Sequence, residues 1–556
     1  MDVRPVVVAV PVGAGGICGH PPMRGRRITV GRVAPGGPDG RRCRAQAGLA
    51  VHGSNQTRPY RMKVVMFSTW DCAGGAAKAA FRLHEALRGA GVDSRMLVKT
   101  RASALPSVAA CAGESEREFI RWGRLEEDLI NRNRSAISGT YFSVGQPGVD
   151  LSEHPWVQAA DVLHLHWVTG FQSAGSIARL LRLGKPVVWS FHDQRAFTGG
   201  CHFSAGCRKY ETDCAPCPQL REDRYGWPAA QLADQAEFWS GHEITVVAPS
   251  RWMGECARRS RLFARARIEV IPYGVETDRY LPADRAALRR ALGWPVDGCY
   301  LLFGAERVGE RRKGFAELRA ALQQCAADTE FRARLERGEI QLVCFGRATG
   351  ELAAAGVPVR ALGYIGADTE MARLYAAADL FVLPSLEDNL PNTILEAMSC
   401  GTPVVAFAVG GVPDLATDGV HGRLVPLGDV GQLCDAIREL VGAPARLVTM
   451  GRQCRQRVET AYAVQHQAAA MRQLYHSLLN ATRELVPQTG ARGLIGSRSA
   501  LALAQVAGDS LIDLNACKVQ IDATTATLAQ TIEQLRRLRQ SKWVRFGRKV
   551  RLLKYE

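Results

Sequence analysis

The stretch Phe381-Val-Leu-Pro-Ser-Leu-Glu-Asp-Asn-Leu-Pro-Asn-Thr-Ile-Leu-Glu-Ala-Met-Ser-Cys-Gly-Thr-Pro-Val-Val-Ala-Phe407 decides the fold of this chain. It predicts a buried apolar strand, a polar loop, and a helix that carries Glu396 in its first turn. A Gly-Thr-Pro break at residues 401–403 then leads into another apolar strand. This order of strand, loop and helix indicates a parallel α/β sheet.

The polar loop and the helix start favour a nucleotide as ligand. Free backbone N–H groups and the positive dipole at a helix N-terminus favour a diphosphate. A carboxylate at the same end, such as Glu396, can accept hydrogen bonds from two vicinal hydroxyls of a ribose. The alternative is an ordinary strand–loop–helix unit that binds nothing.

The same stretch resembles the acidic-x7-Glu motif of family-4 retaining glycosyltransferases, with Asp388 in the first acidic position and Glu396 in the second. Glu387 stands one residue earlier, so either neighbouring carboxylate can take the first position. The resemblance covers roughly residues 62–479 and is strongest over 302–425. It implies donor contacts from the whole loop, that is from Glu387, Asp388, Asn389, Leu390, Pro391, Asn392 and Glu396.

Short apolar strands alternate with helical stretches from Met62 onward, which is the pattern of βαβ units. The predicted strands are 63–68, 95–99, 162–166, 187–191, 245–248 and 270–272 in the first half, and 301–304, 342–346, 380–383, 404–406 and 424–425 in the second. Two doubly wound, Rossmann-like domains that face a crevice form the GT-B fold, which the resemblance implies. Residues 271–280 resemble its interdomain "IPNGVD" signature, with Tyr273 in place of Asn.

We expect four parts along the chain. Residues 1–61 are predicted to be a disordered basic extension or the product of an upstream start codon, and they do not resemble a signal peptide. Residues 62–280 form the acceptor-side domain, with a cysteine-rich insertion at 198–218, and residues 281–480 form the nucleotide-sugar domain. Helices over 430–479 close the second domain, and the resemblance implies that the last one crosses back onto the first. Residues 481–556 form a helical, basic, amphipathic tail.

The formal net charge of +17 over 556 residues is concentrated at the two ends. Residues 1–61 hold ten Arg and two acidic residues, and residues 536–554 hold nine Lys or Arg and no acid. The middle is closer to balance, so the charge argues against nucleic-acid binding. Basic residues interleaved with aromatic ones over 541–555 favour contact with an anionic membrane surface, or alternatively docking on the protein itself.

A second group of residues can neutralise a leaving diphosphate. The sequence contains no Asp-x-Asp motif, which many glycosyltransferases use to hold a divalent metal. The stretch 302–315 instead predicts a strand, a basic loop, and a helix opened by Lys313 and Gly314. The family places an Arg after this strand and a Lys six residues later, which assigns Arg307 and Lys313 to donor binding. Arg311 and Arg312 are alternatives for the arginine role, and a surface basic loop is the alternative without function.

Two further features lie where strands of the first domain end. Gly74 and Gly75 follow the first strand and let the backbone approach a ligand, although a strand–helix turn also needs glycine for shape. His192 and Asp193 end the strand 187–191, at the edge where doubly wound sheets bind ligands. The resemblance assigns His192 to the active-site histidine that contacts the donor sugar. A hydrogen-bonded structural histidine is the alternative.

Four cysteines, Cys201, Cys207, Cys214 and Cys217, cluster within seventeen residues of the insertion. Most of the other twelve cysteines stand singly in apolar contexts, which is typical of a reducing compartment. The cluster predicts a structural zinc held by four thiolates, with two disulfides or unligated thiols as alternatives. The cluster also resembles an insertion in a bacterial subgroup of these enzymes that acts in polysaccharide assembly (colanic-acid type).

Together these features predict a cytoplasmic, retaining, metal-independent glycosyltransferase of hexosyltransferase type. It would move a sugar from a nucleoside diphosphate to a growing polysaccharide or lipid-linked oligosaccharide, with peripheral contact at the inner face of the membrane. The resemblance implies no separate protein base, because a donor phosphate accepts the proton of the acceptor. Two alternatives are a nucleotide-sugar epimerase of the same fold and an assembly subunit with a vestigial donor site. The sequence identifies neither the base and sugar of the donor nor the acceptor.

Overall fold

The computed structural model describes residues 61–111, 126, 129–145, 148–307, 310–347, 356–482 and 498, all of which lie in one compact unit, Tyr60–Glu556. The basic extension at 1–61 and the amphipathic tail at 481–556 lie almost wholly outside the described residues. The membrane contact expected of the tail therefore stays a prediction. No helix in the described ranges is long and apolar enough to span a membrane.

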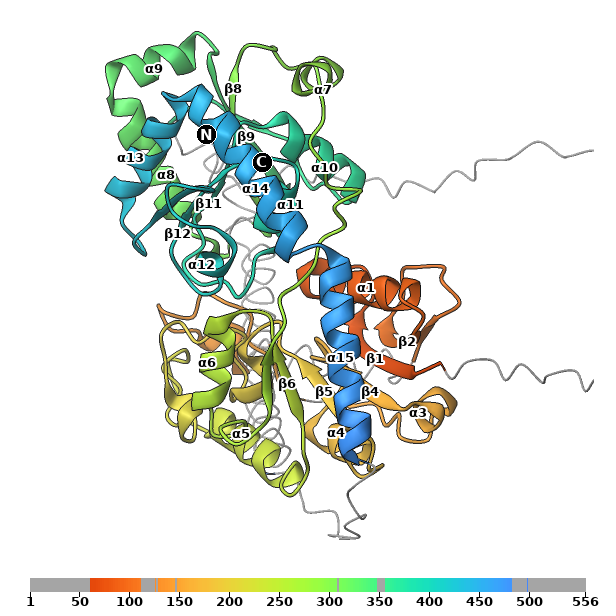
Figure 1. Ribbon diagram of the computed structural model, residues 1–556. Coiled ribbons are helices and arrows are strands. Elements are labelled where there is room, and N and C mark those ends of the chain that lie inside the picture. Colours follow the sequence, from red (N-terminus) through yellow and green to blue (C-terminus); the bar gives the residue numbers. More distant parts are fainter. Residues whose placement is uncertain are drawn as a thin grey trace, which may run out of the picture. The chain divides into compact units, whose positions relative to one another are not determined.

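The first sheet is parallel and has the strand order β3-β2-β1-β4-β5-β6-β7 (Figure 1). The chain leaves β1 toward β2 on one side and returns to β4 on the other, which makes the β1/β4 edge a switch point where doubly wound sheets bind ligands. Its strands are β1 (Lys63–Trp70), β2 (Asp93–Thr100), β3 (Val108–Ala110), β4 (Val162–Leu165), β5 (Val187–Ser190), β6 (Thr245–Ala248) and β7 (Ile268–Val270). The helices between them are α1 (Gly74–Gly89), α3 (Pro155–Ala159), α4 (Ala174–Leu181), α5 (Trp227–Phe238) and α6 (Arg251–Arg259), with short 3₁₀ turns η1 (Asn131–Asn133), η2 (Gln194–Phe197) and η3 (Lys209–Glu211).

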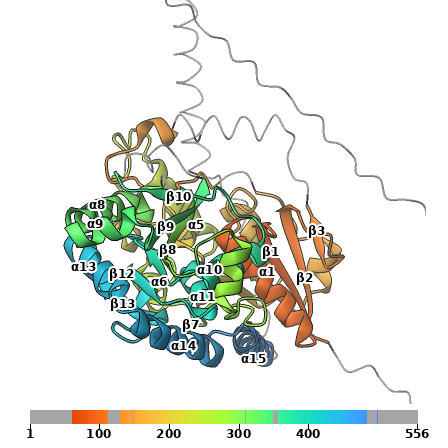
Figure 2. The same cartoon turned by 90° about the horizontal axis from the view of Figure 1, so that it is seen from above.

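The second sheet is also parallel, in the order β10-β9-β8-β11-β12-β13, so its switch point lies between β8 and β11. Its strands are β8 (Cys299–Arg307), β9 (Ile340–Arg347), β10 (Val359–Ala361), β11 (Leu380–Leu383), β12 (Val404–Phe407) and β13 (Gly422–Val425). The helices are α7 (Arg285–Ala291), α8 (Phe315–Ala327), α9 (Thr329–Glu336), α10 (Asp368–Ala377), α11 (Asn392–Ser399), α12 (Val412–Leu415), α13 (Val430–Val441) and α14 (Pro444–Ala461), with the 3₁₀ turn η4 (Arg311–Lys313) before α8. Helices α8, α9 and α13 cover one face of the sheet, and α10 and α11 cover the other (Figure 2).

The last described helix, α15 (Val464–Thr482), joins the second sheet back to the first, as the resemblance implies. It contacts α1 and lies beside it in Figure 1. Met471 and Tyr475 on α15 are fully buried in one apolar cluster with Val64 and Leu83 of the first sheet and its helix. This cluster stabilises the packing of the chain's end on its beginning, because apolar area removed from water contributes about 25 cal/mol per Å².

Each of the eleven strands predicted from apolar runs overlaps a strand of the structure, which has an α/β GT-B architecture. The strand predicted at 270–272 lies at 268–270 instead. The structure adds β3 and β10, which the sequence did not predict. Both have three residues at a sheet edge, and β10 is partly exposed along its length, so neither needs an apolar run.

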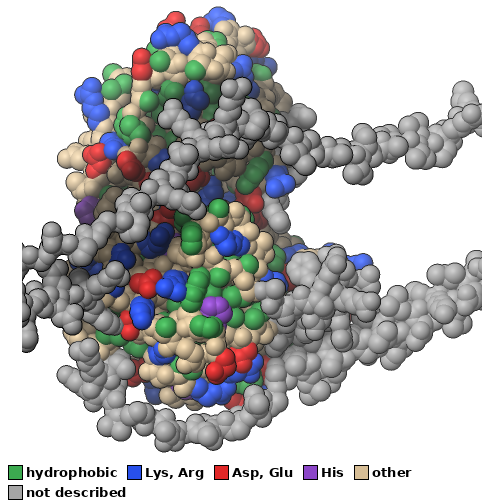
Figure 3. All heavy atoms as spheres, turned by 90° about the vertical axis from the view of Figure 1, so that its right-hand side faces the viewer, with side chains coloured by type: hydrophobic (Ala, Val, Ile, Leu, Met, Phe, Trp, Pro, Cys, Tyr) green, Lys and Arg blue, Asp and Glu red, His purple; other side chains and the backbone are tan. Residues whose placement is uncertain are grey.

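Acidic and basic side chains are intermingled on the face shown in Figure 3. This agrees with the sequence, in which the excess of positive charge belongs to the two ends of the chain.

Candidate active site

The donor loop, residues 384–391, follows β11 and leads into α11. Glu396 is the fifth residue of α11 and therefore lies in its second turn, not in the first turn as the sequence predicted. Its side chain is buried, as are Asp388 and Asn389 of the loop. Leu390 packs its side chain in the apolar core of this half, and its predicted contact with the donor stays a prediction.

The switch point of the second sheet brings the basic turn η4, which follows β8, against the donor loop. Lys313 Nζ lies 2.8 Å from Asp388 Oδ2, and Arg312 Nη1 lies 3.3 Å from the same oxygen. Burial raises the pKa of the Asp388 carboxyl, but the charges of Lys313 and Arg312 outweigh it and hold this pKa below its usual range. Asp388 is therefore the carboxylate that meets the cations, and it stays ionised.

Glycines permit this close approach of backbone to the donor loop. Gly314, the N-cap of α8, has φ +67°, and a Cβ there would overlap the carbonyl oxygen of Pro384. Gly410 has φ +52°, and a Cβ there would overlap the carbonyl oxygen of Asp388. Both positions need glycine for conformation as well as for space. Gly410 was not identified from the sequence, although the Gly-Gly pair after β12 is a visible signal.

Glu387 is engaged by the cysteine-rich insertion. The backbone N–H of Ala205 donates to Glu387 Oε2 at 3.0 Å, and the Ser204 hydroxyl lies 3.5 Å from Oε1. The Arg312 guanidinium lies 4.1 Å from the centre of the Phe203 ring and donates to the carbonyl of Glu387 at 2.9 Å. The insertion therefore fixes the donor loop through Glu387 and Arg312, a contact that the sequence did not predict.

The carboxylate of Glu396 is held by a charged side chain of helix α1, which packs on the first sheet. Arg82 of α1 places one nitrogen 2.7 Å from Glu396 Oε1 and another 2.8 Å from Glu276 Oε2. It also donates to the Tyr280 hydroxyl at 3.1 Å. Burial raises the pKa of Glu396, and the charge of Arg82 partly offsets this. Lys78 lies one turn earlier on α1 and pairs with Asp368 at 2.6 Å. The sequence analysis did not identify Arg82, although the i, i+4 spacing of Lys78 and Arg82 places both cations on one face of the helix.

The glycine loop at the start of α1 contacts the start of α11, and its predicted approach to a ligand stays a prediction. Gly74 has φ +83°, and the carbonyl of Gly75 accepts from the side-chain amide of Asn392 at 2.9 Å. The amide of Asn389 donates to the carbonyls of Phe191 and His192 at 2.9 and 3.1 Å. The side chains of these two asparagines thus connect the second half of the chain to the first. Pro391, between them in the sequence, is the N-cap of α11.

His192 lies at the carboxyl end of β5, and both of its ring nitrogens are engaged by protein groups. Tyr273 Oη lies 2.8 Å from Nδ1, and His166 Nδ1 lies 3.0 Å from Nε2. Burial lowers the pKa of His192 to about 4, so the ring is neutral. Tyr273 stands where the interdomain signature usually has Asn, and it contributes the hydroxyl that orients this ring.

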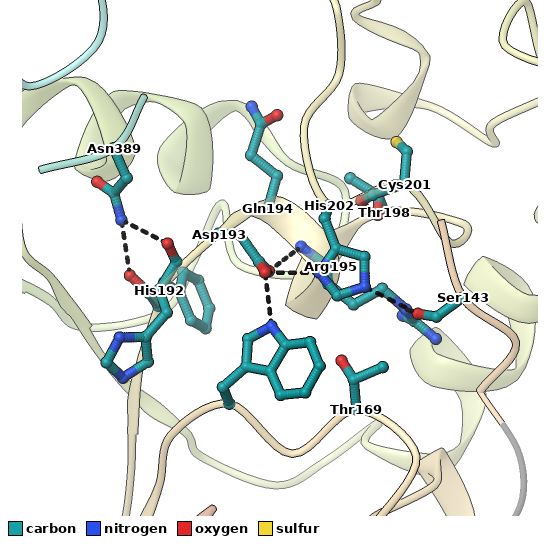
Figure 4. Close-up of polar contacts among 12 residues, drawn as sticks. Ser143, Thr169, His192, Asp193, Gln194, Arg195, Thr198, Cys201, His202 and Asn389 are labelled. Atoms are coloured by element: carbon teal, nitrogen blue, oxygen red, sulfur yellow. Dashed lines mark hydrogen bonds and ion pairs between the residues drawn. The ribbon is translucent and has the colours of Figure 1, made fainter. Parts of the chain in front are cut away.

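Asp193 organises the neighbouring wall, which Figure 4 shows. Its carboxylate accepts from Trp167 Nε1 at 2.7 Å, from His202 Nδ1 at 2.6 Å and from the backbone N–H of Arg195 at 2.9 Å. Burial raises the pKa of Asp193, but His202 and the other donors outweigh it and lower the pKa. Asp193 therefore stays ionised and connects Trp167, His202 and the backbone of Arg195.

The arginine predicted for the diphosphate is placed only in part. Arg307 is the last residue of β8, and its side chain lies outside the described part of the chain. Arg311 is half exposed and pairs with Glu317 at 2.6 Å. Of the two alternatives, Arg312 is the one that contacts the donor loop.

The four cysteines of the insertion line one small cavity and are free thiols. Burial raises the pKa of Cys214 to about 12 and that of Cys217 to about 11, so both are protonated here. Among the described residues, no group of three or more His, Cys, Asp or Glu side chains is arranged to hold a metal ion. To bind zinc, the four sulfur atoms would have to come closer together and the thiols would have to lose their protons. The zinc therefore stays a prediction.

Elemental analysis of the purified protein tests that prediction. We expect about one zinc per chain at a four-thiolate site, because the insertion is rich in glycine and metal binding can order such a segment. Cys214→Ser should lose the metal, whereas Cys344→Ser, which removes a buried thiol of β9, should keep it. Metal-free protein with all four thiols titratable in the native state would contradict the prediction.

Comparison with known proteins identifies the family of this chain. The family "Glycosyltransferase Family 4" matches residues 73–279, and the family "Glycosyl transferases group 1" matches residues 301–443. The D-inositol 3-phosphate glycosyltransferase of Mycobacterium tuberculosis is 29% identical over 453 residues, which cover 77% of this chain and 83% of that protein. The corresponding protein of Mycobacterium bovis matches equally.

Two solved structures show the same fold. Sucrose-phosphate synthase from Thermosynechococcus elongatus has a TM-score of 0.53 at 20% identity and covers 76% of this chain and 100% of that one. Anabaena Alr3699/HepE in complex with UDP and glucose has a TM-score of 0.54 at 17% identity and covers 75% and 100%. The two sheets and the two family matches define a GT-B enzyme. The chain belongs to the family-4, group 1 glycosyltransferases, and it is a glycosyltransferase.

Proposed function

We propose that this chain transfers a hexose, with retention of configuration, from a nucleoside diphosphate to a glycan acceptor without a catalytic metal. The observation that carries the proposal is the meeting of Lys313 and Arg312 on Asp388 at the switch point of the second sheet. An ammonium has three donors, so Lys313 can hold Asp388 and a phosphate oxygen together. Fixed cations in a buried site stabilise the charge that develops on a leaving diphosphate.

The position of Glu396 supports a ribose beside that diphosphate. Its buried carboxylate faces Arg82 with Oε1, and we propose that it also accepts hydrogen bonds from vicinal hydroxyls of the ribose. The Anabaena protein whose structure contains UDP and glucose supports a nucleotide-sugar donor in the same fold. We propose a growing polysaccharide or a lipid-linked oligosaccharide as the acceptor.

The epimerase alternative shares the fold but not the family match. Both halves of the chain match glycosyltransferase families, which favours transfer. The assembly-subunit alternative requires a degenerate donor site. The described site keeps its acidic pair, its lysine and its close-packed glycines, which argues against that alternative.

Calorimetric titration with a panel of nucleoside diphosphates and their sugars tests the donor. We expect one nucleotide to bind, and Glu396→Ala to weaken it about 10- to 150-fold, because losing a hydrogen bond to a charged group costs about 1.5–3 kcal/mol. Glu317→Ala, which removes a carboxylate of α8 that pairs with Arg311, is the matched control and should bind normally. Equal donor affinity in Glu396→Ala and the wild type would remove the ribose assignment.

A further inference from the structure

A cavity of about 50 Å³ lies in the first half, beside the wall that His192 and Asp193 form. The ends of β4 and β5, the start of α4 and one face of α5 surround it, and Trp189 and Trp239 line it with apolar surface. About 10–15 Å³ suffices for one water molecule. The cavity therefore has room for a few waters or for one tetrahedral anion, and not for a whole sugar.

Arg195 brings a positive charge to this cavity. Its Nε donates to the Ser143 hydroxyl at 3.0 Å, and the carbonyl of a correctly oriented Gln235 amide accepts from Nη1 at 3.2 Å. No acidic side chain of the described residues forms an ion pair with its guanidinium. Burial lowers the pKa of Arg195 to about 10, and the charge of nearby Asp193 opposes this shift, so Arg195 remains a cation at neutral pH.

Gln231 adds an unused donor next to Arg195. Its carbonyl oxygen accepts from the backbone N–H of Gly145 at 2.5 Å, and its buried amide nitrogen has no hydrogen-bond partner. A Cβ at Gly145 would lie 2.7 Å from Gln231 Oε1 and 3.1 Å from Arg195 Nη2. Both side chains therefore meet in the same corner of the cavity.

His166, which also lines the cavity, presents a third donor. The buried phenol of Tyr273 stays protonated because burial raises its pKa, and in one tautomer of His192 it donates to Nδ1. In that tautomer His192 carries its proton on Nε2 and donates to His166 Nδ1. This leaves the proton of neutral His166 on Nε2, a buried nitrogen without a partner.

Two carboxylates, Asp193 and Asp234, also line the cavity, and both already accept hydrogen bonds from protein groups. Asp193 accepts from Trp167, His202 and the backbone of Arg195, and Asp234 accepts from the backbone N–H of Arg498 at 2.8 Å. The cavity thus offers a guanidinium and an amide N–H, and in the tautomer described above also the imidazole N–H of His166. A ligand that only accepts hydrogen bonds and carries negative charge satisfies all three.

We propose that this cavity binds an oxyanion, a phosphate or carboxylate group that the acceptor carries, so that Arg195, Gln231 and His166 select an anionic acceptor. The assignment to the acceptor rests on the proposed transfer reaction, but the anion site itself does not. Its position beside His192 places the rest of an acceptor toward the donor loop, because Asn389 of that loop contacts the His192 backbone (Figure 4).

Titration calorimetry of the full-length protein tests the proposal with glucose 6-phosphate, inorganic phosphate and glucose as probes. We expect glucose 6-phosphate to bind more tightly than inorganic phosphate, and glucose not to bind. Gln231→Glu keeps the acceptor for Gly145 N–H but replaces the free donor by a carboxylate, so it should weaken phosphate binding at least about tenfold. Arg195→Lys keeps the charge and should retain weak binding, whereas Arg311→Met on the exposed turn should change nothing.

Nucleotide binding separates this site from the donor site. Gln231→Glu should bind the donor nucleotide as the wild type does, which also shows that the variant is folded. Unchanged phosphate affinity in folded Gln231→Glu, or no binding of either phosphate probe by the wild type, would overturn the anion site. Equal affinity for glucose 6-phosphate and inorganic phosphate would overturn its assignment to the acceptor. If the wild type binds phosphate but binds no nucleotide, the proposed function is overturned and the anion site remains.

Discussion

Lys313→Ala should lower kcat by a factor of about 10²–10³, which is the usual effect of removing one fixed group that stabilises transition-state charge. Lys313 is the residue whose ammonium reaches the donor loop from η4, 2.8 Å from Asp388. The variant should fold, because Lys313 is partly exposed and Arg312 still neutralises Asp388. Turnover of the wild type should be the same in EDTA as in added magnesium. Strict dependence of turnover on a divalent metal would contradict the proposal that cationic side chains neutralise the leaving diphosphate.

Two controls separate catalysis from simple charge balance. Arg311→Ala removes a cation from the same turn, but Arg311 points to Glu317 at the surface, so turnover should hardly change. In Lys313→Ala/Asp388→Asn both members of the ion pair are gone. If Lys313 served only to neutralise Asp388, the double variant would recover turnover. We expect it to remain as slow as Lys313→Ala.

The features that the sequence predicted well are local. Apolar runs bounded by Gly, Pro and polar residues identified the strands, since a strand buried on both faces must be apolar along its length. The spacing from β8 to Lys313 and from β11 to Glu396 placed both residues at the edge where ligands bind. The predicted position of Glu396 within the helix was wrong by about one turn. Pro391 is the N-cap, so the helix begins at Asn392 and Glu396 falls in its second turn.

The features that the sequence did not predict depend on contacts between distant segments. Arg82 and Glu396 are 314 residues apart, and Ala205 and Glu387 are 182 apart. A carboxylate that faces another domain has the same local pattern as one that faces solvent. The choice between Asp388 and Glu387 was open for this reason. Only the packing of η4 on one side and of the insertion on the other distinguishes them.

The Cys-rich insertion illustrates the same limit. Its thiol spacing indicated a metal, but nothing in that spacing pointed to Ser204 and Ala205 as contacts of the donor loop. Backbone N–H groups carry no sequence signature, so a carboxylate bound by Ala205 N–H is invisible before folding. The position of Phe203 under Arg312 likewise follows from the loop's path.

Arg82→Met should destabilise the fold by about 3–5 kcal/mol, the usual cost of removing one partner from a buried ion pair. Arg82 is almost fully buried, and its loss leaves the buried Glu396 without its ion-pair partner and leaves Glu276 paired, among the described residues, only with the more exposed Arg279. Equilibrium urea unfolding of the full-length protein measures the effect, with Arg279→Met, an exposed partner of Glu276, as the control.

The double variant Arg82→Met/Glu396→Gln decides the mechanism of that loss. Removing the charge of Glu396 relieves its burial cost, so the double variant should recover part of the stability that Arg82→Met loses, and the two effects should not add. Donor binding should stay weak in both, because Glu396 is either misoriented or uncharged. Additive losses would mean that Arg82 stabilises the fold through packing on the Tyr280 ring, 5.2 Å from its guanidinium, and not through the carboxylate. Non-additive losses would make Arg82 the residue that positions Glu396 across the two sheets.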